Sequence, residues 1–196
     1  MLSFGVTVLP DPPYQRLIEL TKMAEDQGFE YGWTYDSHVL WQESMPVMAL
    51  AADQTSTIKL GHMVTNPAIR DPTVLASAYA TLQDISNGRM IMGVGRGDSS
   101  VRYVGRQPMK VADFEEALRM VKPFMNGEEV TWNEKQLQLK WVRPELPEIE
   151  AWRRLLDPDV RRSPVAAHMM SLKSMPIFSL NPASKIALWR NVAPAV

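Results

Sequence analysis

The feature that most constrains this chain is a repeated alternation of strand-like and helix-like segments within residues 2–127. Each apolar, β-branched run is followed by a segment whose apolar residues recur at helical spacing. The predicted strands are 2–9, 31–36, 58–65 and 89–97, and the predicted helices are 13–29, 45–56, 71–86 and 111–127. Such alternation predicts parallel strands joined by right-handed crossovers. Both a doubly wound sheet and a (β/α)8 barrel fit this pattern.

Composition and charge are typical of a globular domain. The chain has 196 residues, of which 45% are hydrophobic and 22% charged, as in an ordinary globular domain. Its net charge of −1 gives no basis for binding nucleic acid or an anionic membrane surface. No apolar run reaches the roughly 18 residues of a membrane span, and the first residues do not resemble a signal peptide. We therefore expect a cytoplasmic protein. The absence of cysteine excludes disulfides and thiolate metal sites.

The pattern changes after residue 127. The run "EEVTWNEKQLQLKWV" fits a short β-hairpin or meander. Residues 128–196 contain no glycine, and residues 161–196 contain no Asp or Glu. Prolines interrupt this end, and "SKIALWRNV" (184–192) fits a short helix without a matching strand. We interpret 148–196 as an irregular, poorly ordered tail that was not selected to fold here, such as an out-of-frame end. The alternative is a genuine but irregular extension.

Polar residues follow the predicted strands at their carboxyl ends, where parallel α/β folds bind ligands. The strand ends present Asp36, Ser37 and His38, then Thr65 and Asn66, then Gly95, Gly97 and Asp98. Each group has an ordinary explanation as a cap or turn. Together they indicate a ligand-binding mouth.

The sequence gives little support for a nicotinamide-binding site, a metal site or a Ser-His-Asp site. The run "GVGRGD" has the spacing G-x-G-x-G, which argues against a nicotinamide-binding Rossmann turn. His38 is the one histidine at a plausible site, and we expect His62 to be a packed core residue within its strand. His62 and His168 lack the spacing of metal ligands, so we expect no metal. No Ser-His-Asp order or nucleophile elbow is present.

The runs "GFEYGWTYDSH" and "IKLGHMVTNPAIRDPTVLASAYATLQDISNGRMIMGVGRGD" resemble the luciferase-like monooxygenase superfamily. The resemblance extends over residues 1–147. It is greatest to the coenzyme F420-dependent branch that includes methylenetetrahydromethanopterin reductase. It implies a (β/α)8 barrel that binds F420 or FMN at its carboxyl-end mouth. The implied chemistry is hydride transfer or oxygen activation at the ring, acting on a small-molecule substrate.

The resemblance also implies roles for individual residues. Asp36 and His38 are the implied catalytic residues, although His38 lies one place later than in the reductases, where Ser37 takes the His position. Many family members have a non-prolyl cis peptide bond at the end of the third strand, which here corresponds to Met63–Val64. The implied cofactor-binding residues are Met63, Val64, Thr65, Asn66, Gly95, Gly97 and Asp98.

Chain length limits how much of a barrel is present. A closed (β/α)8 barrel takes about 250 residues, so we expect residues 1–147 to form about half a barrel. Such a half would expose strand edges at its first and fourth strands and an uncovered inner face, which favours self-association as a homo-oligomer. Two functions follow as alternatives. One is a flavin- or F420-dependent oxidoreductase, and the other is a truncated, inactive cofactor-binding or assembly fragment.

Overall fold

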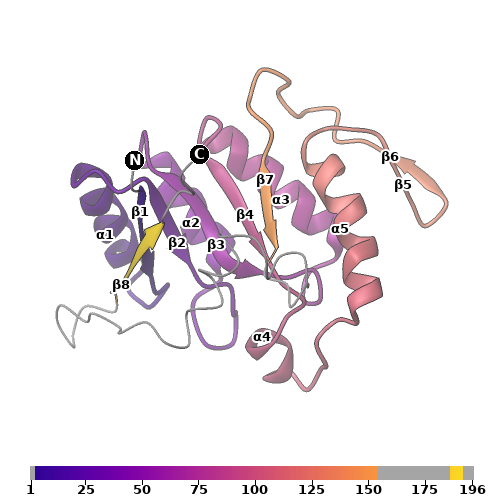
Figure 1. The fold of residues 1–196 in the computed structure, drawn as a ribbon, viewed down its shortest axis with the longest axis horizontal. Helices are drawn as coiled ribbons and strands as arrows, with labels where there is room; N and C mark the ends of the chain where they lie inside the picture. Colours follow the sequence, from indigo (N-terminus) through magenta and orange to yellow (C-terminus); the bar gives the residue numbers. More distant parts are fainter. Residues whose placement is uncertain (1–2, 154–185, 192–196) are drawn as a thin grey trace.

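A computed structural model describes residues 3–153 and 186–191 of the chain. A sheet with the strand order β7-β4-β3-β2-β1-β8 forms its centre, and a separate β5–β6 hairpin projects away from it (Figure 1). In chain order the elements are β1 (Ser3–Val8), α1 (Tyr14–Asp26), β2 (Tyr31–Thr34), α2 (Ser44–Asp53), β3 (Lys59–Thr65), α3 (Pro72–Ile85), β4 (Met90–Val94), α4 (Ser99–Arg102), α5 (Val111–Met125), β5 (Val130–Trp132), β6 (Lys135–Leu137), β7 (Glu150–Arg153) and β8 (Ile186–Asn191).

The predicted alternation of strand and helix is confirmed. Strands β1 to β4 pair in parallel in chain order, with a helix in each crossover. Asp71 caps α3 by accepting a 2.8 Å hydrogen bond from the N–H of Thr73, and Pro72 begins the helix, as predicted. The hairpin is also confirmed, with β5 antiparallel to β6. The short helix α4, which follows β4, was not predicted.

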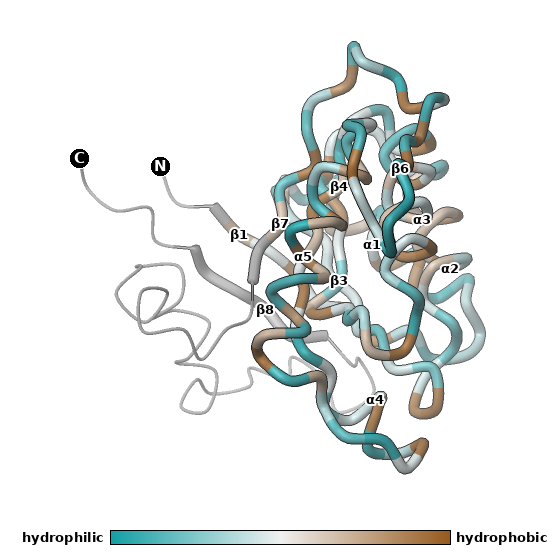
Figure 2. Tube along the Cα trace, turned by 90° about the vertical axis from the view of Figure 1, so that its right-hand side faces the viewer, coloured by the Kyte–Doolittle hydropathy of each residue, from teal (hydrophilic) through white to brown (hydrophobic). Residues whose placement is uncertain are grey.

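The helices cover one face of the sheet. Figure 2 shows α2 and α3 together on one side of β3 and β4. The core between them is continuous and apolar, as expected when a parallel sheet is covered by its crossover helices. From the strands it includes Val6, Val8, Leu60, Met90, Met92 and Val94, and from the helices Leu17, Leu20, Met48, Leu75, Tyr79, Phe114 and Val121.

The other face of the sheet is not open, contrary to expectation. Trp33, Gly61 and Ile91 lie on this face, where Gly61 and Ile91 are register partners in β3 and β4. A Cβ at Gly61 would come within 2.7 Å of the Trp33 ring and 2.3 Å of the Ile91 carbonyl oxygen, so the indole lies directly over this glycine. Trp33 and Ile91 are only 6% and 5% exposed. The expectation of an uncovered inner face is therefore wrong at these positions.

Both edges that we expected to be exposed are paired. β7 lies parallel to β4, with Ile91 opposite Glu150, and β8 lies antiparallel to β1, with Val6 opposite Leu188. The short helix predicted over 184–192 is wrong, because this segment satisfies the edge of β1 as a strand. The rest of the predicted tail, residues 154–185 and 192–196, lies outside the described residues. Among the described residues, no helix is long and apolar enough to span a membrane.

Candidate functional site

The candidate site lies at the carboxyl ends of β2, β3 and β4. Because these strands are parallel, the residues that follow them meet at one edge of the sheet. The structure brings Asp36 and Thr65 into direct contact there, and Gly97 lies beside Asn66. This confirms that polar residues converge at one edge, although several of them bind each other.

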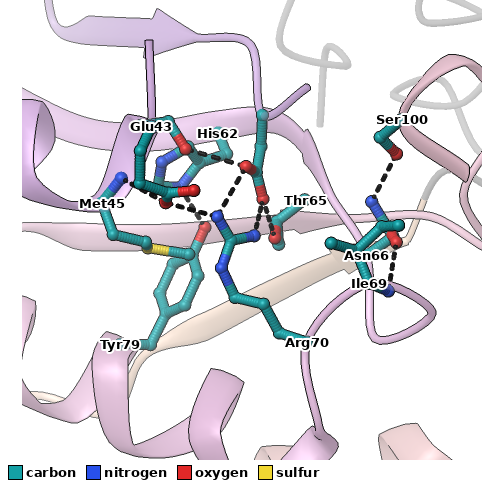
Figure 3. A network of polar contacts seen from close by, with 11 residues as sticks. Glu43, Met45, His62, Thr65, Asn66, Ile69, Arg70, Tyr79 and Ser100 are labelled. Atoms are coloured by element: carbon teal, nitrogen blue, oxygen red, sulfur yellow. Dashed lines mark hydrogen bonds and ion pairs between the residues drawn. The ribbon is translucent and has the colours of Figure 1, made fainter. Parts of the chain in front are cut away.

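Asp36 is the centre of a buried polar network. Figure 3 shows this network with Thr65, Arg70 and Glu43 labelled. Its Oδ2 accepts hydrogen bonds from Thr65 Oγ1 at 2.6 Å and Arg70 Nη1 at 2.5 Å. Its Oδ1 accepts from Ser44 Oγ at 2.9 Å and Arg70 Nη2 at 3.0 Å. Arg70 Nη2 also binds Glu43 Oε1 at 2.5 Å. The Asp36 side chain is 2% exposed, and both its oxygens are occupied.

This network keeps Asp36 ionised. Burial alone would raise the pKa of Asp36, but the positive charge and hydrogen bonds of Arg70, together with the hydrogen bond from Thr65, hold it below its usual value. His62 is fully buried, and burial lowers its pKa, so His62 is neutral at pH 7 and Arg70 supplies the compensating charge. An ionised carboxylate that accepts four hydrogen bonds holds the donor side chains in place. It has no proton to donate at neutral pH.

His62 lies behind this network on the helix-facing side of β3. Its Nδ1 is 2.6 Å from the hydroxyl of Tyr79 in α3, and neither side chain is exposed. The two rings meet edge to face, with their centroids 5.6 Å apart. Burial raises the pKa of Tyr79 well above its usual value, so this pair carries no charge at pH 7. The prediction that His62 is a packed core residue is confirmed.

The end of β3 contains the peptide bond singled out from the sequence. Met63–Val64 is cis, and the register between β3 and β4 shifts between His62 and Thr65. Met63 and Val64 are half-buried, whereas Thr65 is fully buried. Gly95 continues β4 beside this segment and donates its N–H to the carbonyl of Thr65 at 2.9 Å.

Asn66 connects the loops after β3 and β4. Its Nδ2 donates to Ser100 Oγ in α4 at 3.0 Å, and its Oδ1 accepts from the N–H of Ile69 at 3.1 Å. Gly97 lies against this amide with a φ of +84°, and a Cβ there would approach Asn66 Oδ1 to 3.2 Å. The Asn66 side chain thus connects the loop after β3 with α4.

Two of the predicted residues lie at the surface. His38 is exposed in the turn after β2. Asp98 is exposed before α4 and forms an ion pair with Arg102 at 2.7 Å, one helical turn away. Neither residue contacts the Asp36 network.

The residues present fit the flavin or deazaflavin that the resemblance implies. Ser37 directly follows Asp36 and is 5% exposed, yet its Oγ has no hydrogen-bond partner among the described residues. A buried hydroxyl without a partner is a free donor and acceptor for a ligand. Ser37, the half-buried Met63–Val64 segment, and the backbone around Gly95 and Gly97 are the groups that would hold such a ring.

No other part of the described residues offers a better candidate for a ligand or metal site. A hollow of about 220 Å³ lies near the amino end of β4, between α3, α5 and residues 141–148. Its amide side chain Gln83 is already bonded to the N–H of Met90 and the carbonyl of Pro147. No group of three His, Asp or Glu side chains in the described part of the chain could hold a metal ion.

Sequence reasoning missed Arg70 and Glu43. Arg70 lies in the quoted run "NPAIRDP" but received no role, because its partners Asp36 and Glu43 are 34 and 27 residues away. The one sequence signal for its role was that this charged side chain lies between a turn and the helix cap Asp71.

Comparison with known proteins agrees with the resemblance found in the sequence. Residues 2–158 match the family described as luciferase-like monooxygenase. A 5,10-methylenetetrahydromethanopterin reductase from Methanopyrus kandleri is 48% identical over 99 residues, which are 50% of this chain and 28% of that protein. The chain spans less than half the length of the curated reductases that it matches.

Solved structures show the same fold. The coenzyme F420-dependent tetrahydromethanopterin reductase from Methanopyrus kandleri superposes with a TM-score of 0.68 at 29% identity, covering 87% of this chain and 53% of that one. A Baeyer-Villiger monooxygenase from Pseudomonas putida, solved with FMN, gives a TM-score of 0.54 at 17% identity over 76% of this chain and 49% of that one. The β/α units described above therefore form part of a TIM-barrel-type fold.

Proposed function

We propose, from the premise that this chain belongs to the luciferase-like monooxygenase family, that it binds the ring of coenzyme F420 or FMN at the carboxyl ends of β2, β3 and β4. The observation that carries this proposal is the buried, unpartnered Ser37 hydroxyl beside the fixed ends of β2 and β3. When bound, the ring supplies the redox chemistry of an oxidoreductase acting on a small molecule. The chain's own residues bind and orient the ring.

F420 is the first candidate among the two cofactors. The reductase relative that is 48% identical over 99 residues belongs to a class whose solved structure is named as F420-dependent. The relative solved with FMN is only 17% identical, so it supports the fold without distinguishing the ligand.

The test is a fluorescence titration of the purified chain with F420 and, separately, with FMN. We expect saturable quenching with one of them, F420 first. Ser37→Ala should weaken that binding roughly 3- to 10-fold, the loss of about one net hydrogen bond. Ser77→Ala on α3 is the matched control and should bind normally. Linear, unsaturable signals with both cofactors would refute the proposal.

A second candidate function is cofactor binding without turnover. It is favoured by the two implied catalytic residues, because both oxygens of Asp36 are occupied by hydrogen-bond donors and His38 is exposed. Saturable binding, with no redox change of the bound ring when alcohols or other small-molecule hydride donors are added as substrates, would support this candidate over an active oxidoreductase.

A further inference from the structure

We propose that Arg70 is a positioning residue, which clamps both ends of the loop 37–42 and thereby sets Ser37 and His38 relative to the bound ring. The inference rests on the proposed function. It assigns to Arg70 a role that acts through the loop and involves no contact with the ring.

The clamp reaches both ends of the loop with one side chain. At the start, Arg70 Nη1 and Nη2 bind the two oxygens of Asp36 at 2.5 and 3.0 Å. At the end, Nη2 binds Glu43 Oε1 at 2.5 Å. Glu43 in turn caps α2 by accepting from the N–H of Met45 at 3.3 Å. The loop is therefore held at residues 36 and 43 by the same guanidinium group.

Between these anchors the loop is a turn closed by its own hydrogen bonds. The carbonyl of Ser37 accepts from the N–H groups of Leu40 and Trp41 at 2.9 and 3.0 Å. Gln42 donates its N–H to the carbonyl of Pro10 at 3.0 Å, which ties the loop to the segment after β1. A turn closed on itself transmits a shift at either anchor to both Ser37 and His38.

The clamp is itself fixed by its chain neighbours. Ile69 is bonded to Asn66, which also holds Ser100 in α4, and Asp71 caps α3. Arg70 thus projects from a backbone that is held on both sides, and Figure 3 shows its side chain beside Glu43 and Thr65. The loops after β2, β3 and β4 are connected in this way.

The Arg70–Asp36 ion pair differs from the surface ion pairs in its burial and in its geometry. The Arg70 and Asp36 side chains are 14% and 2% exposed, whereas those of Arg102 and Asp98 are 56% and 83% exposed. The planar fork of arginine binds two oxygens of one carboxylate and a second carboxylate together, which the single ammonium of lysine does not reproduce. Arg70→Lys should therefore keep the charge and lose the clamp.

The experiment compares the full chain with Arg70→Lys in two measurements below the melting temperature. Hydrogen exchange reports the loop 37–42, and fluorescence titration reports binding of F420 and FMN. We expect faster exchange in the loop, unchanged exchange in β3 and β4, and at least 10-fold weaker binding of the cofactor that the wild type binds. Arg16→Lys, in an exposed pair with Glu19 on α1, is the matched control and should change neither.

A second pair of variants distinguishes positioning from folding. The Glu43 side chain is 47% exposed, so Glu43→Gln and Glu43→Ala should both fold. Glu43→Gln keeps an acceptor for Arg70 and Met45 and should bind nearly as the wild type does. Glu43→Ala should loosen the loop and weaken binding several-fold, with a thermal midpoint close to that of Glu43→Gln.

The outcomes separate the two proposals. If the wild type binds and Arg70→Lys and Glu43→Ala bind equally well, the positioning role is refuted and the proposed function stands. Weakened binding that only follows the unfolded fraction also refutes it, because Arg70 is then merely structural. If the wild type binds neither cofactor, the proposed function fails and the inference fails with it.

Discussion

At the scale of single residues, Glu25 shows how one side chain can make stability depend on pH. Its Oε1 accepts from the N–H groups of Ser56, Thr57 and Ile58 at 2.8, 2.5 and 2.9 Å. Burial raises the pKa of Glu25, but these hydrogen bonds together outweigh it and lower the pKa from 4.5 to about 2. We expect Glu25→Gln to lower the free energy of unfolding at pH 7 by about 1–2 kcal/mol, a value reduced by solvent screening.

The sign of the pH effect follows from linkage. Because folding lowers the pKa of Glu25, its contribution is complete above pH 4.5 and is lost as the pH falls toward about 2. Urea unfolding of the wild type and Glu25→Gln should therefore differ most at pH 7 and converge in acid. Glu116→Gln, exposed on α5, is the control. A difference that stays constant from pH 7 to pH 2.5 would contradict this assignment.

At the scale of elements, Arg89 ties α2, β3 and α3 together through one guanidinium. Its nitrogens donate to five acceptors at 2.7–3.0 Å. These acceptors are the carbonyls of Ala52, Thr55, Ile58 and Ser86 and the hydroxyl of Thr55. Arginine has five N–H donors, so each has a partner here. Lysine offers three, and we expect Arg89→Lys to cost about 2–3 kcal/mol of stability.

Thermal and urea unfolding would measure this cost, with Arg119→Lys on the exposed face of α5 as the control. Cofactor binding below the melting temperature should remain normal, because Arg89 lies at the amino end of β4, away from Ser37. Equal stability of the two variants would show that the bonds of Arg89 are replaceable by water.

At the scale of the whole molecule, the sheet depends on a strand that is distant in sequence. β8 pairs antiparallel with β1 over the register from Ser3–Asn191 to Val8–Ile186. A chain ending at Lys185 would leave the backbone groups of β1 unpaired at an edge, and such edges promote association between chains. We expect this truncation to lower the thermal midpoint and to increase self-association, measured by sedimentation velocity.

A chain ending at Asn191 keeps β8 and is the matched control for this truncation. It should remain as stable and as dispersed as the full chain. A monomeric chain ending at Lys185 with an unchanged midpoint would show that β8 does not protect the edge of β1. Homo-oligomer formation by the full chain is a separate expectation that the same sedimentation experiment tests.

The sequence by itself determined the four strands β1 to β4, the long helices between them and after β4, and their order. The helical spacing of apolar residues and the Asp71–Pro72 start of α3 depend on neighbours within one or two helical turns. Parallel β/α units followed from that order. The polar residues at the strand ends predicted the edge at which they meet, and the resemblance in the run around "VTNPAIRDP" located the Met63–Val64 bond.

The tertiary structure alone decided what those polar residues do. Asp36 is occupied by Arg70 and by Thr65, whose hydroxyl donates to it. The Ser37 hydroxyl has no partner among the described residues, and His38 lies at the surface. It also decided that residues 186–191 form a strand on β1, where their local pattern fitted a helix. The physical reason is the same in each case. These assignments depend on partners tens of residues away, and local periodicity contains no record of which donor meets which acceptor after the chain folds.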